Sequence, residues 1–308
     1  MRRFFRIAPM FYIAIVLYVL LNGFAASYWA PNGIKWWFVL LTALFLHGFH
    51  PETIDSVVPG GWSIAVEMTF YLTFPLLMKY IKSIPSSLAF LALSLLLCKL
   101  SNLIFYQIYY DSYPAHQQYL VSSFLSQNFF GQMPVFAIGI LSCFIFENKN
   151  TLKRTVLICD CAFAFMVLLE FIVLLPHFGT NLLSNYIVFS GIFALGALNL
   201  AIFPVRLLVN GVITLIGEIS FSMYLVHFAV IYGLSRSGFT SLFKLGDVSS
   251  LLYFLCVVAV TAAVSRFLYA AIETQGILFG KRLIGKLEAS ARSAQLLPSP
   301  DIPLHRDA

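Results

Sequence analysis

A stripe of polar side chains on an apolar segment is the first feature of the sequence that points to chemistry. Ser63, Glu67 and Tyr71 recur every four residues, so on a helix they lie along one face. A carboxylate in apolar surroundings must be paired, protonated or open to a wet cavity. We therefore expect a functional role for this stripe, and a structural hydrogen bond between helices is the alternative.

His227 ends a second segment of mixed polarity, which begins at Gly217. If its helix enters a membrane at residue 212, His227 lies roughly 23 Å further along the axis, close to the depth of Glu67. This match favours a site that combines Glu67 with His227, and Tyr224 lies on the same helix face as His227. The alternative is a core histidine whose hydrogen bonds are satisfied locally.

Three arginines stand at the start of the chain. Arg2 and Arg6 are four residues apart and Arg3 and Arg6 are three apart, so their guanidinium groups converge on one side of a helix. Forked guanidinium donors suit phosphate groups. The alternative is a basic anchor at the inner face of a membrane.

Metal binding is not expected. His47 and His50 are three residues apart, but no third ligand is near them in the sequence, and a proton-handling or substrate-contacting role stays open for both. The cysteines form no CxxC pair and no zinc-type cluster with histidine. They stand at Cys98, Cys143, Cys159, Cys161 and Cys256, in or beside apolar stretches.

The composition places these residues in a lipid bilayer. Of the 308 residues, 60% are hydrophobic and 10% are charged, where a soluble domain carries about 25% charged residues. The mean hydropathy is +0.88. The net charge of +6 comes from basic residues between apolar runs, which topology explains, so nucleic acid is not expected as a partner.

The apolar runs predict an all-α fold, a polytopic membrane helix bundle with about eight crossings. The predicted crossings are 7–27, 62–81, 87–108, 129–147, 156–176, 185–203, 212–234 and 249–272. A further run, 36–49, is too short to cross and is expected to form an outer re-entrant or interfacial segment. Glu273, at the end of the last run, is expected to make a polar contact between helices.

Basic residues orient the bundle. With eight crossings, the N-terminal arginines, Lys79, Lys82 and Lys281 fall on one face, so the positive-inside rule predicts that both termini are cytoplasmic. Residues 286–308 are expected to be a disordered cytoplasmic tail. The small residues after the first apolar run also fit a secretory leader with a cleavage site, which is an alternative to a retained first helix.

These segments together resemble the membrane acyltransferase-3 family, whose members O-acylate cell-surface sugars and other acceptors. Residues 2–12 are similar to the family's basic, proline-containing helix entry, and residues 62–75 to its internal Trp-Ser motif with a following glutamate. Residues 217–227 resemble its late Ser/Tyr/Leu/His motif, and residues 272–282 its closing segment. The motifs follow the family order, although Thr274-Gln275 replaces the usual basic residue and proline.

The resemblance implies an acyltransferase domain over residues 1–285 in the inner (plasma) membrane of a bacterium. It would move an acyl group, expected to be acetyl, from acyl-CoA to a hydroxyl of a cell-surface or lipid-linked carbohydrate. The implied catalytic residues are Glu67, His227 and Tyr71, and the implied ligands of the acyl-CoA phosphates are Arg2, Arg3 and Arg6.

The sequence also departs from the family. Family members begin with two further helices, which carry an arginine, the histidine taken as catalytic base and a Ser-Gly-Phe motif, and this sequence starts after both. A catalytically inactive, truncated relative is therefore an alternative. A polytopic transporter or flippase is a weaker one, because the sequence contains no repeated halves with broken helices.

Overall fold

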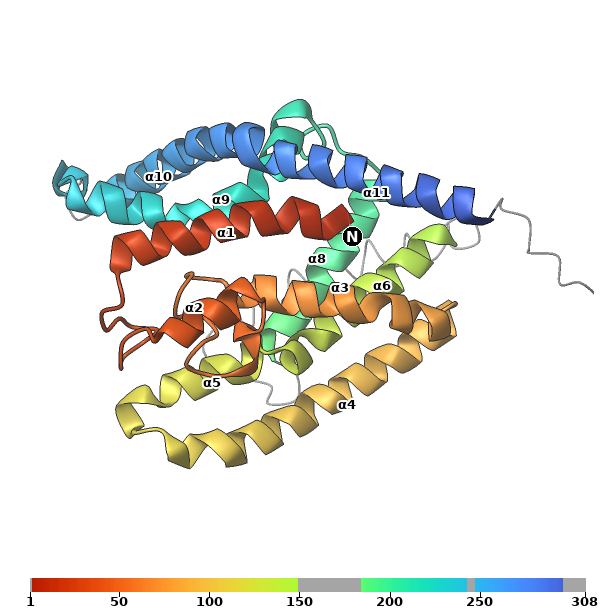
Figure 1. Cartoon of the computed structure of the whole chain (residues 1–308), viewed down its shortest axis with the longest axis horizontal. Helices are drawn as coiled ribbons and strands as arrows, with labels where there is room; N and C mark the ends of the chain where they lie inside the picture. Colours follow the sequence, from red (N-terminus) through yellow and green to blue (C-terminus); the bar gives the residue numbers. More distant parts are fainter. Residues whose placement is uncertain (1, 149–183, 243–246, 296–308) are drawn as a thin grey trace, which may run out of the picture. The chain divides into compact units, whose positions relative to one another are not determined.

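The computed structural model describes residues 2–148, 184–242 and 247–295, and its regular elements there are all helical (Figure 1). The α-helices are α1 (Arg2–Asn22), α2 (Trp36–Ala43), α3 (Trp62–Tyr80), α4 (Ile84–Tyr109), α5 (Gln118–Gln127), α6 (Phe129–Glu147), α8 (Asn185–Ile202), α9 (Gly211–Arg236), α10 (Asp247–Leu268) and α11 (Thr274–Gln295). Short 3-10 turns and one π-helical turn, η5 (Tyr269–Glu273), connect some of them. The predicted all-α class is confirmed.

Within the described residues, six helical stretches are long and apolar enough to cross a membrane. They are Arg2–Asn22, Ile84–Ser112, Ala115–Glu147, Asn185–Ile202, Gly211–Arg236 and Val248–Ser290, and each overlaps a predicted crossing. The run at 62–81 does form a helix, α3, but its polar stripe lowers its hydropathy and it is not one of the six. The run at 156–176 lies outside the described residues, so the count of eight stays a prediction.

The short run at 36–49 does not form one continuous helix. It contains α2, which ends at Ala43, and a 3-10 turn, η1 (His47–Phe49). Phe45 between them has a φ of 61°, a left-handed conformation that breaks the helix. Eight residues of α2 span about 12 Å, which is too short for a crossing, as predicted.

The chain divides into two compact units, whose boundaries fall inside α1 and α9. One unit comprises residues 15–218 and the other residues 1–14 with 219–308. Each is described by itself below.

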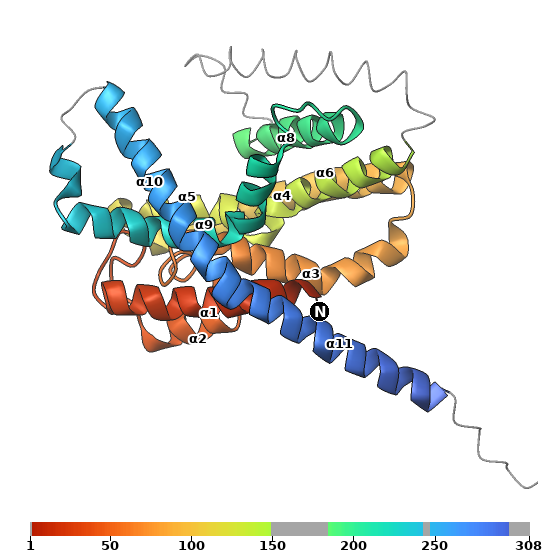
Figure 2. The ribbon, with the colours of Figure 1, turned by 90° about the horizontal axis from the view of Figure 1, so that it is seen from above.

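In the unit of residues 15–218, α4 and α6 lie side by side (Figures 1 and 2). The helix entries are locally encoded. Ser83 accepts a hydrogen bond from the backbone of Ser86 in a capping box before α4, and Asn128 accepts one from Gly131 at the start of α6. Beside these helices, a cluster of buried apolar residues packs α3 against α6. It consists of Phe70, Ile81, Phe90, Met133, Ala137 and Ile140.

The helices α4, α6 and α8 meet at the backbone carbonyl of Gly131, and the Cα of Gly131 lies against the end of α5. Tyr186 of α8 donates a hydrogen bond to the carbonyl of Gly131 at 3.0 Å, and the buried Cys98 of α4 contacts the same carbonyl at 3.7 Å. A Cβ at Gly131 would lie 2.7 Å from the carbonyl oxygen of Leu125, so only glycine fits there. This junction fixes the frame on which α3 is held.

In the other unit, α11 crosses the first half of α1 at two glycines four residues apart. A Cβ at Gly276 would lie 2.5 Å from the carbonyl oxygen of Phe5, and a Cβ at Gly280 would lie 2.6 Å from the Cβ of Phe5. This is a GxxxG contact, in which the absence of side chains lets two backbones approach. The rings of Phe5 and Phe279 add an edge-to-face contact at 5.7 Å.

The structure differs from the sequence predictions in three places. The first helix begins at Arg2 and ends at Asn22, because Gly23 takes a φ of +62° and terminates it. The sequence did not predict the helix α5, because Gln and Ser residues interrupt its apolar pattern. One face of this helix is nevertheless apolar, and Leu120 and Phe124 on it are buried.

The third correction concerns the tail. The chain runs from α10 through η5 into α11 without a loop (Figure 2), and α11 continues to Gln295. Disorder is therefore wrong for residues 286–295, which form the last turns of the amphipathic helix α11 and carry the charged residues Lys286, Glu288 and Arg292. Residues 296–308 lie outside the described part of the chain.

Candidate active site

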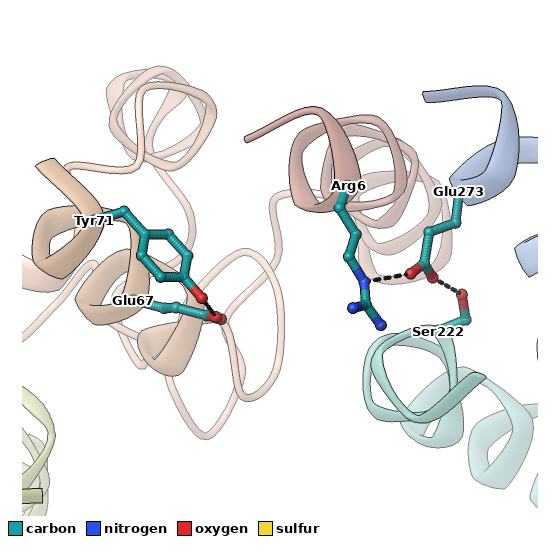
Figure 3. Close-up of polar contacts among 5 residues, drawn as sticks. All are labelled: Arg6, Glu67, Tyr71, Ser222 and Glu273. Atoms are coloured by element: carbon teal, nitrogen blue, oxygen red, sulfur yellow. Dashed lines mark hydrogen bonds and ion pairs between the residues drawn. The ribbon is translucent and has the colours of Figure 1, made fainter. Parts of the chain in front are cut away.

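A buried carboxylate joins three helical segments in the unit of residues 1–14 and 219–308. Glu273, in η5, is fully buried and forms an ion pair with Arg6 of α1, whose Nε lies 3.0 Å from Oε1 (Figure 3). Ser222 of α9 donates a hydrogen bond to the other carboxylate oxygen, Oε2, at 3.0 Å. The predicted polar contact of Glu273 between helices is confirmed.

The π-helical turn explains how Glu273 reaches this position. A π-helical turn inserts an extra residue into an α-helix and rotates the side chains that follow it, and such turns are frequent at functional sites. Here it brings Glu273 to the face where α1 and α9 pack, while α11 continues beyond it. Ser222 was not singled out in the sequence, although it lies in the same motif as His227.

The three N-terminal arginines occupy different environments. Arg2 and Arg3 are exposed in the first turn of α1, whereas the side chain of Arg6 is 36% exposed and held by Glu273. The ion pair uses Nε of Arg6. No further hydrogen bond of this guanidinium to the described residues is present, so its two Nη groups can serve another anion.

His227 lies in α9 and is half-buried. Its Nδ1 is 2.7 Å from the carbonyl oxygen of Tyr224, one turn earlier in the same helix. Because a carbonyl oxygen can only accept, Nδ1 carries a proton, and the lone pair of the neutral ring is on Nε2. The ring of Phe228 packs against the imidazole, with ring centroids 4.0 Å apart, and limits its rotation.

Glu67 and Tyr71 are paired in the unit of residues 15–218. The hydroxyl of Tyr71 donates a hydrogen bond to Oε1 of Glu67, one turn away on the same face of α3 (Figure 3). Both side chains are partly buried, and α3 is held in place by the stacking of Phe70 on Phe136 of α6, with ring centroids 3.9 Å apart. The predicted stripe therefore contains a tyrosine–carboxylate pair, and the pairing of Glu67 with His227 stays a prediction.

His47 is buried in the loop between α2 and α3, where it holds the loop against the start of α3. Its Nε2 donates a hydrogen bond to the carbonyl of Gly61 at 2.9 Å, just before α3. Thr53 donates to the carbonyl of His47 at 2.7 Å and so closes the loop on itself. Burial lowers the pKa of His47 from 6.5 to about 4, and the hydrogen bond to Gly61 opposes this shift in part. The ring is neutral at pH 7.

Asp55 lies in the same loop and was not singled out in the sequence. Its carboxylate accepts a hydrogen bond from the backbone N–H of Trp62, the first residue of α3, at 3.4 Å. Burial raises the pKa of Asp55 from 3.8 to about 7, and the bonds from the backbone of Trp62 and Gly60 limit the rise. Asp55 is seven residues before Trp62, and the residue directly before α3 is Gly61, so no local N-cap pattern pointed to Asp55.

A polar cavity of about 470 Å³ lies between this loop and the C-terminal end of α4. Its lining includes Asn32, His50, Glu52, Tyr109, Tyr113 and Gln117. Nζ of Lys35 lies 3.9 Å from Oε2 of Glu52 and forms an ion pair with it. The ring of His50 packs edge-on against that of Tyr109, with ring centroids 5.6 Å apart. Burial and the nearby Glu52 raise the pKa of Tyr113, so its hydroxyl stays protonated. Of the histidine pair singled out in the sequence, His47 and His50, the second lines this cavity.

The fold and these sites define a class: a polytopic α-helical membrane protein that keeps paired ionisable side chains within its helices. The family model described as "Acyltransferase domain" matches residues 1–270, and the chain belongs to the acyltransferase-3 family. Comparison with curated proteins and with solved structures gives no match. The resemblance to this family is thereby confirmed over residues 1–270, a range that holds the first three motifs and ends before the closing segment at residues 272–282.

Proposed function

We propose that the protein transfers an acyl group, acetyl in the simplest case, from acyl-CoA to a hydroxyl of a cell-surface or lipid-linked carbohydrate. The observation that carries the proposal is the arginine cluster at the start of α1. Arg2 and Arg3 are exposed there, and Arg6 is oriented by Glu273. The N-terminus of a helix is itself favourable for anions, so phosphates gain from both the dipole and the guanidinium groups.

The proposed chemistry is an attack of the acceptor hydroxyl on the thioester carbonyl. The new ester bond forms as the carbon–sulfur bond breaks and CoA leaves as the thiolate, which becomes the thiol when the base that took the hydroxyl proton passes it on. The hydroxyl proton passes to a base, for which the Nε2 lone pair of His227 is suited. Glu67 has a second role in this proposal. Its carboxylate, which the hydroxyl of Tyr71 holds in place, orients the acceptor hydroxyl.

The polar cavity supports a carbohydrate acceptor. Sugars present hydroxyl groups and apolar C–H faces, which match the amides and carboxylate of Gln117, Asn32 and Glu52 beside the rings of Tyr109 and Tyr113. With cytoplasmic termini in a bacterial inner membrane, this cavity lies on the outer side, because it is at the opposite end of α4 from Lys82.

The test is transfer of labelled acetyl from acetyl-CoA by the purified protein in liposomes, with lipid-linked glycan as acceptor. The wild type is expected to label the glycan and release CoA thiol in equal amounts. Arg2→Ala/Arg3→Ala should raise KM for acetyl-CoA about tenfold, since a charge-assisted hydrogen bond contributes about 1.4 kcal/mol or more. Arg206→Ala, which removes an exposed arginine before α9, is the matched control and should leave KM unchanged.

An unchanged KM in the double variant would refute the role of the arginines. A wild type that binds acetyl-CoA but labels no glycan would instead support the inactive-relative alternative.

A further inference from the structure

An apolar cavity of about 570 Å³ opens between α3 and α6, in the unit of residues 15–218. Its walls come from the C-terminal half of α3, the residues just after it and one face of α6. The apolar residues in its lining include Phe74, Met78, Phe136 and Phe144. The mechanism proposed above does not use this cavity, and its lining contains none of the predicted site residues.

The cavity is built rather than incidental. The stacked rings of Phe70 and Phe136 form one wall, and Phe70 is itself buried in the core of the unit at 7% exposure. A Cβ added at Gly139, which also lines the cavity, would meet no atom within 4 Å. The volume is within the range of about 300–1,000 Å³ that is typical of ligand pockets.

Two opposite charges stand at the edge of this cavity. Lys82 follows the end of α3, and Glu147 is the last residue of α6 and of a stretch long enough to cross a membrane. Both side chains are exposed. An end of a spanning helix lies at the level of lipid headgroups. The apolar walls therefore face hydrocarbon depth, and the charges face the headgroup region.

We propose that this cavity holds one acyl chain of an aminophospholipid of the phosphatidylethanolamine type. The lipid phosphate contacts Lys82, and the ammonium group donates to the carboxylate of Glu147. One cation and one anion at the mouth complement a zwitterionic headgroup with hydrogen-bond donors better than a purely anionic one. Carbohydrate and nucleotide do not fit, because the interior offers them few polar partners.

The experiment is native mass spectrometry of the full chain released from nanodiscs of phosphatidylcholine mixed with either phosphatidylethanolamine or phosphatidylglycerol. The wild type is expected to retain one phosphatidylethanolamine. Gly139→Leu places a larger side chain in the cavity and should reduce the fraction of protein that retains phosphatidylethanolamine about tenfold. Gly191→Leu in α8 is the matched control, because a Cβ there also meets nothing within 4 Å and Gly191 does not line the cavity; it should retain the lipid.

The headgroup contacts are tested separately. Lys82→Gln should weaken retention of phosphatidylethanolamine, Glu147→Gln should abolish its preference over phosphatidylcholine, and Lys79→Gln, an exposed lysine outside the lining, should change neither. Equal retention in Gly139→Leu, a preference for phosphatidylglycerol, or a dimer without lipid would each overturn the proposal. The measurement involves no acyl transfer, so its outcome is independent of the proposed enzymatic function.

Discussion

Arg6 and Glu273 are 267 residues apart in the sequence, yet their side chains form an ion pair of 3.0 Å between α1 and η5. The two partners differ in exposure: Glu273 is fully buried, whereas Arg6 is 36% exposed. Removing the arginine leaves an unpaired buried carboxylate, and removing the carboxylate leaves a cation that still reaches polar surroundings. The pair is therefore asymmetric in its effect on stability.

We predict that Arg6→Ala destabilises the protein by about 3 kcal/mol, and that Glu273→Gln costs clearly less because its amide still accepts from Ser222. The double variant should be more stable than Arg6→Ala alone, since it no longer buries an unpaired charge. Thermal unfolding in one detergent, with all four proteins compared, provides the measurement. Equal losses for the two single variants would contradict the asymmetry.

The glycine contact between α1 and α11 predicts a position-specific cost. Gly276→Ala should destabilise by about 1–3 kcal/mol, because the new methyl group meets the backbone carbonyl of Phe5, which cannot rotate away. Gly285→Ala, in the same helix with open space around it, should be neutral or slightly stabilising because alanine favours a helix. Melting temperatures of the two variants, recorded side by side, decide the matter; similar losses would disprove the close contact.

The loop between α2 and α3 predicts two opposing pH dependences. The lowered pKa of His47 makes the free energy of unfolding rise with pH between about 4 and 6.5, where the unfolded chain holds the extra proton. The raised pKa of Asp55 makes the free energy of unfolding fall between about pH 3.8 and pH 7, because the folded chain holds the extra proton there. In the wild type the two trends largely offset each other.

Single substitutions should separate these trends. Asp55→Asn should leave a stability that rises with pH from 4 to 6.5, and His47→Gln one that falls from pH 4 to 7, each by at most about 1.4 kcal/mol per pH unit. The measurement is the melting temperature across this pH range in fixed buffer ionic strength. Parallel pH profiles in the two variants would show that the loop does not bury both groups.

His227 can be probed by two amides that mimic different ring nitrogens. The amide nitrogen of Asn takes the place of Nδ1 and can keep the hydrogen bond to the carbonyl of Tyr224, but it has no basic lone pair. If His227 is the general base, His227→Asn should lose about 10²–10⁴ in kcat while the melting temperature changes little. Retained kcat in His227→Asn, with a lowered melting temperature in His227→Gln, would assign this residue a structural role.

Much of the fold followed from local properties of the sequence. Apolar run length located each of the described spanning stretches, because burying a helix in hydrocarbon requires about 20 apolar residues in a row, although Ala115–Glu147 and Val248–Ser290 extend well beyond the predicted runs. The four-residue spacing of Glu67 and Tyr71 likewise predicted a shared helix face, and the structure pairs them. The helix α5 was missed because its apolar face is short and interrupted by polar side chains.

The sequence by itself determined the membrane environment, the helical class and the family motifs, since hydropathy, periodicity and motif order are properties of neighbouring residues. Only the tertiary structure decided which partner each polar residue takes. It joined Arg6 to Glu273, set Gly276 against Phe5 and buried His47 with Asp55 in one loop. The first two contacts link residues more than two hundred positions apart, and all depend on how helices and loops pack, which no local pattern encodes.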